Sequence, residues 1–238
     1  MIAFDSTLRE TLTELGVSYT DQMIRTAADY ASYLLDENQK MNLTAIVDEK
    51  EIAVKHFADS LCLLKYAEIP EGSSLIDVGT GAGFPGMVLK IFRPDLKLTL
   101  ADSLKKRCLF LERLCSELDI NDVKILWGRA EELGREPELR ESFHFSVARA
   151  VAALPVLLEY CTPFLKIGGA FLAMKAKEEY FDDNKALTVL ECVEEEKVKY
   201  QLNGEDRTLI IVRKTGKTPE KYPRRPGMPE KKPLCLVK

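Results

Sequence analysis

The sequence predicts an α/β fold built on a doubly wound, mostly parallel sheet of seven strands, and three observations support this. From Gly72 onward, short β-rich runs alternate with amphipathic helical stretches, which is the pattern of βαβ crossovers. The last two β-rich runs flank Asn203-Gly204, a strong signal for a two-residue hairpin turn. The 238 residues are 46% hydrophobic and 30% charged, which is an ordinary globular composition. We therefore expect a parallel sheet that ends in a C-terminal antiparallel hairpin.

Seven runs of the sequence are the expected strands of this sheet. The stretches between them favour helices, as in Leu104–Leu118, where Cys108, Leu111 and Cys115 share one face. Five parallel strands followed by a hairpin are the layout of class I methyltransferases, whereas ordinary dinucleotide-binding domains normally lack the hairpin. The expected strands are Ser74–Val78, Leu96–Ala101, Val123–Trp127, Phe143–Ala148, Ala170–Met174, Lys197–Leu202 and Arg207–Val212.

The first 70 residues lack this alternation and indicate an N-terminal helical cap. Leu8, Leu12 and Leu15 keep one helical face, and Gly16 suits the C-terminal cap of that helix. Ser18-Tyr19-Thr20-Asp21 has capping-box spacing before a second apolar stripe, and a third helical pattern covers residues 49–66. We expect a cap over residues 1–70, the sheet domain over 71–213 and a basic tail over 214–238.

Composition excludes several classes of protein. No apolar run approaches the ~18 residues that span a bilayer, and the first residues lack the features of an export signal, so a cytoplasmic location is expected. The six cysteines form no CxxC pair and there are two histidines, so we expect no metal site. Charge is uneven along the chain. Residues 213–238 carry nine Lys or Arg and two acids, which gives this segment a net charge of +7. Because the whole chain has a net charge of −4, the preceding 212 residues have a net charge of −11.

A glycine turn follows the first expected strand. Asp77 is the next-to-last residue of that strand, and Gly79, Gly81 and Gly83 follow with GxGxG spacing. The dinucleotide fingerprint would need a glycine where Phe84 stands, and no Lys-Ser/Thr follows the glycines as a P-loop requires. S-adenosylmethionine carries no pyrophosphate and needs room for its amino-acid part against bare backbone. The turn therefore favours this cofactor.

Two further segments fit the same nucleoside. Asp102 ends the next strand, 25 residues after Asp77, where a carboxylate can accept both ribose hydroxyls. After the third strand, Ala130 and Glu131 lie where adenine would bind and can hydrogen-bond it through backbone and side chain. Trp127, just before them, is equally consistent with a plain core residue.

The sequence lacks the motifs of several classes of nucleic-acid methyltransferase, and this reduces the range of methyl acceptors. The segment Ser146–Val151 lacks the proline-aromatic motif of adenine or cytosine amino-group methylation. No Pro-Cys dipeptide supplies the nucleophile of cytosine-C5 methylation. Acceptors with a free lone pair remain, including guanine N7, which needs no general base, and we accordingly assign no catalytic acid or base. A small-molecule or protein methyltransferase, and a non-catalytic cofactor-binding regulatory module, stay open.

Seven blocks occur in order from about Asn42 to Leu234. They are Asn42-Leu43-Thr44, Lys55-His56-Phe57-Ala58-Asp59-Ser60, the DVGTGAGFPG turn, Asp102-Ser103 with Lys105-Lys106-Arg107, Gly128-Arg129-Ala130-Glu131, Ala148-Arg149-Ala150 and Tyr222-Pro223-Arg224-Arg225. Together these blocks resemble the bacterial 16S ribosomal RNA guanine-N7 methyltransferases, the glucose-inhibited division protein B family. The resemblance implies a class I S-adenosylmethionine-dependent methyltransferase fold and methylation of N7 of one guanine in 16S ribosomal RNA. It implies cofactor contacts at Gly79, Phe84, Ala130, Glu131 and Arg149.

This chain departs from the family pattern at three places. Lys55 stands where the family usually has arginine, and His144 where it usually has an acid. Ala176 follows Lys175 where the family often has glycine, a change that would loosen the loop over the active site.

Basic residues supply the expected contacts with RNA. The expected partner is 16S ribosomal RNA or the precursor small subunit, and we expect the enzyme to be a monomer. Lys105, Lys106 and Arg107 occupy the first turn of a helix, where the helix dipole disfavours cations, and this favours phosphate contact over a solvated helix end. Lys55 and His56 of the cap are candidates to face RNA, although a satisfied, half-buried His56 fits equally well.

Three arginines complete the set. Arg149 interrupts an apolar run at a strand end, so it must meet a carboxylate, phosphate or ligand. Arg224 and Arg225 lie between prolines beside Tyr222 and can present guanidinium groups to phosphates. The alternative is that this tail packs across the sheet domain as a C-terminal strap.

Overall fold

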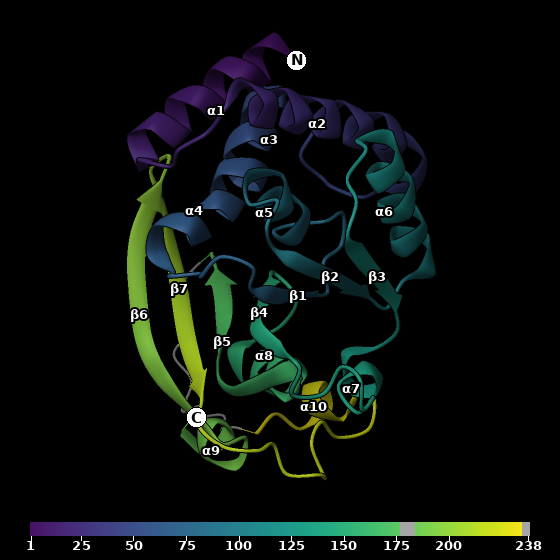
Figure 1. Ribbon diagram of the computed structural model, residues 1–238, viewed down its shortest axis with the longest axis vertical. Coiled ribbons are helices and arrows are strands. Elements are labelled where there is room, and N and C mark those ends of the chain that lie inside the picture. Colours follow the sequence, from purple (N-terminus) through teal and green to yellow (C-terminus); the bar gives the residue numbers. More distant parts are fainter. Residues whose placement is uncertain (177–183, 235–238) are drawn as a thin grey trace.

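The computed structural model describes residues 1–176 and 184–234, and it has the predicted seven-stranded sheet (Figure 1). The strand order is β3-β2-β1-β4-β5-β7-β6. The first five strands pair in parallel, and β7 pairs antiparallel with both β5 and β6. The strands are β1 (Ser74–Val78), β2 (Lys97–Asp102), β3 (Val123–Trp127), β4 (Phe143–Arg149), β5 (Leu165–Lys175), β6 (Cys192–Leu202) and β7 (Glu205–Lys214).

The strand boundaries follow the apolar pattern where both faces of a strand are covered and depart from it elsewhere. β1 and β3 have the predicted bounds, and Asn203-Gly204 forms the hairpin turn with φ of 49° and 75°. β5 and β6 each begin five residues before the predicted start. Leu165 and Cys192, the first residues of these extensions, are buried, whereas most of the residues that follow them are exposed and do not continue the apolar pattern.

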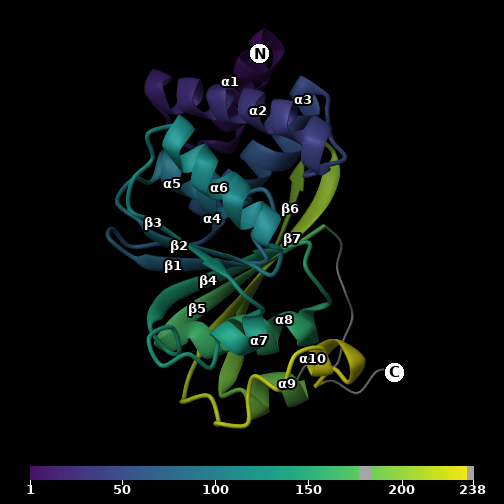
Figure 2. The same cartoon turned by 90° about the vertical axis from the view of Figure 1, so that its right-hand side faces the viewer.

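Helices cover both faces of the sheet (Figures 1 and 2). Two buried hydrophobic clusters lie between helices and sheet, and consecutive strand residues face opposite clusters: Leu75 belongs to one and Ile76 to the other. On the first face lie α1 (Ile2–Leu15), α2 (Asp21–Met41), α3 (Glu49–Ile52), the π-helical η1 (Ala53–Ala58), α4 (Asp59–Tyr66), α5 (Gly86–Phe92) and α6 (Lys105–Glu117). On the second lie α7 (Ala130–Leu133), α8 (Leu154–Cys161), the 3₁₀ turn η2 (Thr162–Phe164), α9 (Asn184–Val189) and α10 (Met228–Lys231).

The cap helices end where local chemistry dictates. Gly16 closes α1 with φ of 70°, as predicted. The capping prediction for α2 is wrong by two residues: Thr20, not Ser18, is the N-cap, and its side chain accepts the Met23 N–H at 3.2 Å. The apolar stripe begins at Met23, so a cap at Ser18 would leave this N–H of the first turn unpaired.

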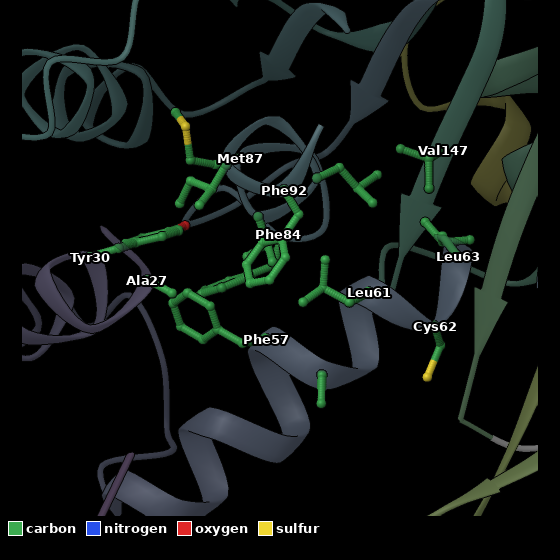
Figure 3. Close-up of a cluster of buried hydrophobic side chains, with 14 of the residues drawn as sticks. Ala27, Tyr30, Phe57, Leu61, Cys62, Leu63, Phe84, Met87, Phe92 and Val147 are labelled. Atoms are coloured by element: carbon green, nitrogen blue, oxygen red, sulfur yellow. The ribbon is translucent and has the colours of Figure 1, made fainter. Parts of the chain in front are cut away.

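Aromatic side chains join the cap to the glycine turn (Figure 3). Phe84 stacks on Tyr30 of α2, with ring centroids 5.3 Å apart, and meets the edge of Phe57 of η1 at 5.5 Å. The Tyr30 hydroxyl donates to the Ala82 carbonyl. The cap and the sheet therefore share one hydrophobic cluster, and the cap positions the glycine turn directly.

Candidate active site

The glycine turn is tied to its own strand by a buried carboxylate. Asp77 Oδ2 accepts the Thr80 hydroxyl at 2.7 Å and the Gly86 N–H at 2.8 Å, which bridges both ends of the turn. Complete burial raises the pKa of Asp77 to about 6, against these hydrogen bonds and the charge of Arg149, which lower it. Sequence reasoning placed Asp77 before the turn but gave it no role in the site. The structure makes it the residue that shapes the turn.

Asp102 connects the same turn to the next strand. Its Oδ2 accepts the Gly81 N–H and its Oδ1 the Leu104 N–H, both at 2.9 Å. Arg107 Nη1 lies 3.3 Å from Oδ2. The carboxylate thus lies at the carboxyl ends of β1 and β2, where open α/β sheets bind ligands.

A cavity of about 120 Å³ lies beside these two turns. It brings together four of the predicted cofactor residues: Gly79, Asp102, Ala130 and Glu131. A Cβ at position 79 would lie 2.7 Å from Val151 Cγ2, so a side chain there would collide with the loop after β4. Bare backbone at the turn, a carboxylate at the strand end and polar groups after β3 are what the nucleoside part of S-adenosylmethionine requires. The cavity therefore fits this cofactor.

Two residues of the cavity were missed by sequence reasoning. Tyr160 of α8 and Glu230 of α10 line it, and the Tyr160 hydroxyl donates to Glu230 Oε1 at 3.2 Å. Glu131 is buried and accepts the Gly227 N–H at 2.8 Å, so the tail forms one wall of the cavity. No local motif marks these partners, because 70 to 96 residues separate them along the chain.

Gly81, Phe84 and Arg149 do not line this cavity. The Gly81 N–H is bound by Asp102, and the Phe84 ring is buried in the aromatic contact with the cap. Arg149 Nη1 donates to Asp59 Oδ2 at 2.9 Å, and Arg207 Nε donates to the other carboxylate oxygen at 3.0 Å. The carboxylate that Arg149 was predicted to need is therefore Asp59 of the cap.

Arg149 lines a second, larger cavity, of about 690 Å³, at the carboxyl ends of β4 and β5. Lys55, Lys175 and Arg207 line it as well, and Val151 lines both cavities. The loop after β4 therefore separates the smaller cavity from one whose lining includes four cations and one carboxylate, Asp59. Sequence reasoning missed Asp59 and Arg207, which meet across 148 residues.

His56 is the half-buried, hydrogen-bonded residue of the two alternatives considered. Its Nε2 lies 2.8 Å from Thr44 Oγ1, and its ring stacks on Phe84 with centroids 4.6 Å apart. Burial and the nearby Arg149 lower the pKa of His56 to about 4, so the ring is neutral near pH 7. It lines the second cavity without adding charge to it.

The residues predicted to bind RNA are held in different ways. Lys55 pairs with Glu51 at 2.9 Å and Glu205 at 3.3 Å, and Arg107 with Asp102. Lys106 Nζ reaches the Met41 carbonyl at 3.3 Å. Lys105 lies 5.0 Å over the ring of Trp127, which is 59% exposed, so the alternative of a core tryptophan is wrong.

The tail packs against the sheet domain in the manner of a strap. Tyr222 is buried, and the Arg140 guanidinium donates to its carbonyl at 2.9 Å. Arg224 pairs with Glu159, a carboxylate with no exposed surface, at 2.6 Å, whereas Arg225 is exposed. The RNA role of both arginines stays a prediction, and the strap geometry supports it for Arg225 alone. Cys235 and the last three residues of the predicted tail lie outside the described residues.

Solved structures share this fold at low sequence identity. The chain superposes on a SAM dependent methyltransferase from Aquifex aeolicus with a TM-score of 0.53 at 16% identity, over 75% of this chain and 97% of that one. It superposes on the B. subtilis tRNA methyltransferase TrmK with a TM-score of 0.52 at 10% identity, over 67% and 66%. Fold and cavity together define a class I S-adenosylmethionine-dependent methyltransferase, as predicted.

Sequence comparison gives the family. The family model described as "rRNA small subunit methyltransferase G" matches residues 23–210. The protein named "Ribosomal RNA small subunit methyltransferase G" of Pelotomaculum thermopropionicum is 45% identical over 239 residues, 98% of this chain and 100% of the relative. Its namesake in Acetivibrio thermocellus is 48% identical over 223 residues, 92% of each chain. The chain belongs to the rRNA small subunit methyltransferase G family.

The described part of the chain contains neither a candidate membrane-spanning helix nor a candidate metal site. Among residues 1–176 and 184–234, no helix is long and apolar enough to cross a membrane. The same residues contain no group of three or more His, Cys, Asp or Glu side chains placed to hold a metal ion.

Proposed function

We propose that this protein methylates N7 of one guanine in the 16S ribosomal RNA of the small subunit, in the cytoplasm. The observation that carries the proposal is the pair of adjoining cavities, one shaped for a nucleoside cofactor and one lined by four cations. Lys55, Arg149, Lys175 and Arg207 give the second cavity a charge that suits a polyanion. The names of the family and of its curated relatives point to the same substrate.

The residues of the first cavity hold and orient the cofactor. Because all three line this cavity, Asp102 would accept the ribose hydroxyls, and Ala130 and Glu131 would contact the base. When bound, S-adenosylmethionine would supply an electrophilic methyl group: in an in-line displacement the bond from N7 to the methyl carbon forms as the sulfur–methyl bond breaks, and S-adenosylhomocysteine leaves. Since N7 carries no proton, the protein contributes position rather than acid–base chemistry.

The second cavity receives the acceptor. Guanine N7 points into the major groove, which is deep and narrow in A-form RNA, so the target lies in a loop or is flipped out of a helix. N7 methylation leaves a positive charge on the purine. The neutral ring of His56 adds no repulsion to that charge, and Asp59 offsets part of the charge of the two arginines.

One labelling experiment tests the proposal against the other two classes. Methyl-labelled cofactor is offered with naked 16S RNA, small subunits, ribosomal proteins and a metabolite extract, and labelled RNA is cleaved at N7-methylguanine. We expect label in RNA or small subunits and cleavage at a single site. Label in protein or metabolites would indicate a different methyltransferase, and cofactor binding without label would indicate a regulatory module.

A further inference from the structure

Trp127 is a large aromatic side chain left in solvent at the edge of the active site. It is the last residue of β3, the edge strand of the sheet, and therefore lies at the carboxyl ends of the strands, where both cavities open. Trp127 is the one tryptophan of the chain, and it is 59% exposed. Single exposed apolar residues are common on protein surfaces, so the exposure alone assigns no role to the ring, and its neighbours have to be considered.

The fold explains both the exposure and the fixed position of the ring. α6 packs on β3, and the Cys108 thiol of α6 reaches the Leu126 carbonyl of β3 at 3.7 Å. Trp127 follows as the last residue of β3, an edge strand with β2 as its one neighbour in the sheet. The indole N–H donates to the Ser103 carbonyl at 3.1 Å, which holds the ring in place.

The ring lies outside the cofactor cavity. That cavity is lined by Ser103, whose carbonyl accepts the indole N–H, and by the segment that begins at Gly128, the residue after Trp127. Trp127 itself is not part of the lining. A partner of the exposed ring is therefore separate from the cofactor bound in this cavity.

A cation lies over the ring. The Lys105 ammonium is 5.0 Å from the ring centroid, and Lys106 and Arg129, which are close to this pair in sequence, are exposed. Within the described part of the chain, none of these three cations forms an ion pair. An exposed aromatic ring beside unpaired cations is the arrangement by which proteins bind single-stranded nucleic acid, the ring stacking on a base and the cations contacting phosphates.

We propose that Trp127 is a stacking platform for an unpaired RNA base close to the target guanine, with Lys105 contacting a phosphate of the same strand. This inference rests on the proposed function, because an RNA substrate supplies the base. It also gives Lys105 the RNA contact that Arg107, paired with Asp102, does not provide in this structure.

Because Trp127 is the sole tryptophan, its fluorescence reports on this position alone. Wild-type protein is titrated with a single-stranded uridine octamer, with an abasic ribose-phosphate octamer of the same length, and with S-adenosylhomocysteine. Stacking predicts strong quenching by the uridine octamer and little by the other two. No quenching by RNA, equal quenching by the abasic strand, or quenching by S-adenosylhomocysteine alone would each overturn the proposal.

Affinity measurements on variants give a second readout. Binding of fluorescein-labelled octamer to Trp127→Leu is expected to weaken about 5- to 100-fold, the usual worth of one stacked base, whereas Trp127→Phe keeps most of the affinity. Ile167→Ser is the matched control, because Ile167 is 57% exposed but lies at the amino end of β5. Equal affinity of Trp127→Leu and wild type would contradict the platform.

Failure of this inference is distinguishable from failure of the proposed function. If wild-type protein labels N7 of guanine while Trp127 ignores RNA, the platform alone is wrong. If the octamer stacks on Trp127 while no RNA is labelled, the proposed reaction is wrong and the binding surface stands.

Discussion

Asp102 has two tasks at one carboxylate. It lines the cofactor cavity, and it also accepts the backbone N–H groups of Gly81 and Leu104. Removing the side chain would therefore disturb the turns as well as the ligand. A substitution that keeps the shape and one acceptor oxygen retains one of the two backbone hydrogen bonds and so limits the disturbance of the turns.

We predict that Asp102→Asn weakens S-adenosylmethionine binding about 10- to 100-fold, because a hydrogen bond to a charged group contributes about 1.5–3 kcal/mol. Isothermal titration calorimetry gives the affinity, and Glu132→Gln, a nearby exposed acid, is the control. A folded Asp102→Asn protein with wild-type affinity would remove Asp102 from the ribose site.

The environment of His56 predicts how the stability of the protein and the protonation of this ring depend on pH. Its pKa is lowered to about 4, below the ordinary 6.5, so the folded state disfavours the protonated ring. The stability that neutral His56 contributes is present above pH 6.5 and is lost as the pH falls toward 4. By NMR, the His56 ring protons should not titrate between pH 7 and 5; burial and the nearby charges of Lys166 and Lys97 also lower the pKa of His144. A His56 midpoint near 6.5 would contradict the buried, neutral ring.

At the residue scale, the sequence allowed residues to be grouped where chemistry is local. Gly79, Asp102, Ala130 and Glu131 each lie next to a strand end, parallel strands bring those ends to one edge, and the four residues line one cavity, while their contact with the cofactor stays a prediction. The pairing of Arg107 with Asp102 was not foreseen, and the RNA contact of Arg107 also stays a prediction. A one-turn pattern cannot show which carboxylate lies within reach of a long side chain.

At the scale of elements, Asp59 ties the cap to β4 and β7. Arg149 and Arg207 each bind one of its oxygens, and all three side chains are largely buried. The loop that separates the two cavities follows Arg149 directly. We therefore expect this ion-pair network to position that loop.

Arg149→Met tests the network. Loss of one charged hydrogen bond to Asp59 should lower the free energy of unfolding by about 1.5–3 kcal/mol, since Arg207 remains to neutralise the carboxylate. Urea denaturation measures this loss, and methyl transfer per folded molecule should fall as well. Full stability would show that Arg149 is not held by Asp59, and normal transfer would separate the loop from the network.

Two neighbouring arginines of the tail, Arg224 and Arg225, are predicted to affect different properties of the protein. Arg224→Ala leaves the buried Glu159 without its cation and should destabilise the protein by about 3–5 kcal/mol. Arg225→Ala should leave the melting temperature unchanged but make the log–log salt dependence of RNA binding shallower by about 0.7, the value for one phosphate contact on a single strand. An unchanged slope would mean that the tail is a strap only.

The parallel pairing of the first five strands and the final hairpin were predictable, because each βαβ unit has a local sequence pattern and Asn203-Gly204 marks the hairpin turn. The strap was not, because Gly227 meets Glu131 and Arg224 meets Glu159 only after the sheet has formed. These contacts join segments 96 and 65 residues apart, and no spacing in the sequence encodes them.

At the scale of the whole molecule, the cap and the sheet behave as one body because they share a hydrophobic cluster. The cap supplies Tyr30 and Phe57 to the glycine turn and Asp59 to the loop between the cavities. We propose that it belongs to the catalytic unit rather than standing as a separate RNA-binding module.

The central claim is that one cofactor cavity delivers methyl groups to N7 of a single guanine. The most direct measurement is mass spectrometry of nucleosides and oligonucleotides from 16S RNA incubated with wild-type protein and with Asp102→Asn. The account predicts up to one N7-methylguanine per RNA, at one position, formed much more slowly by the variant at limiting cofactor. Methylation at another atom, at many guanines, or at equal rates in both proteins would contradict it.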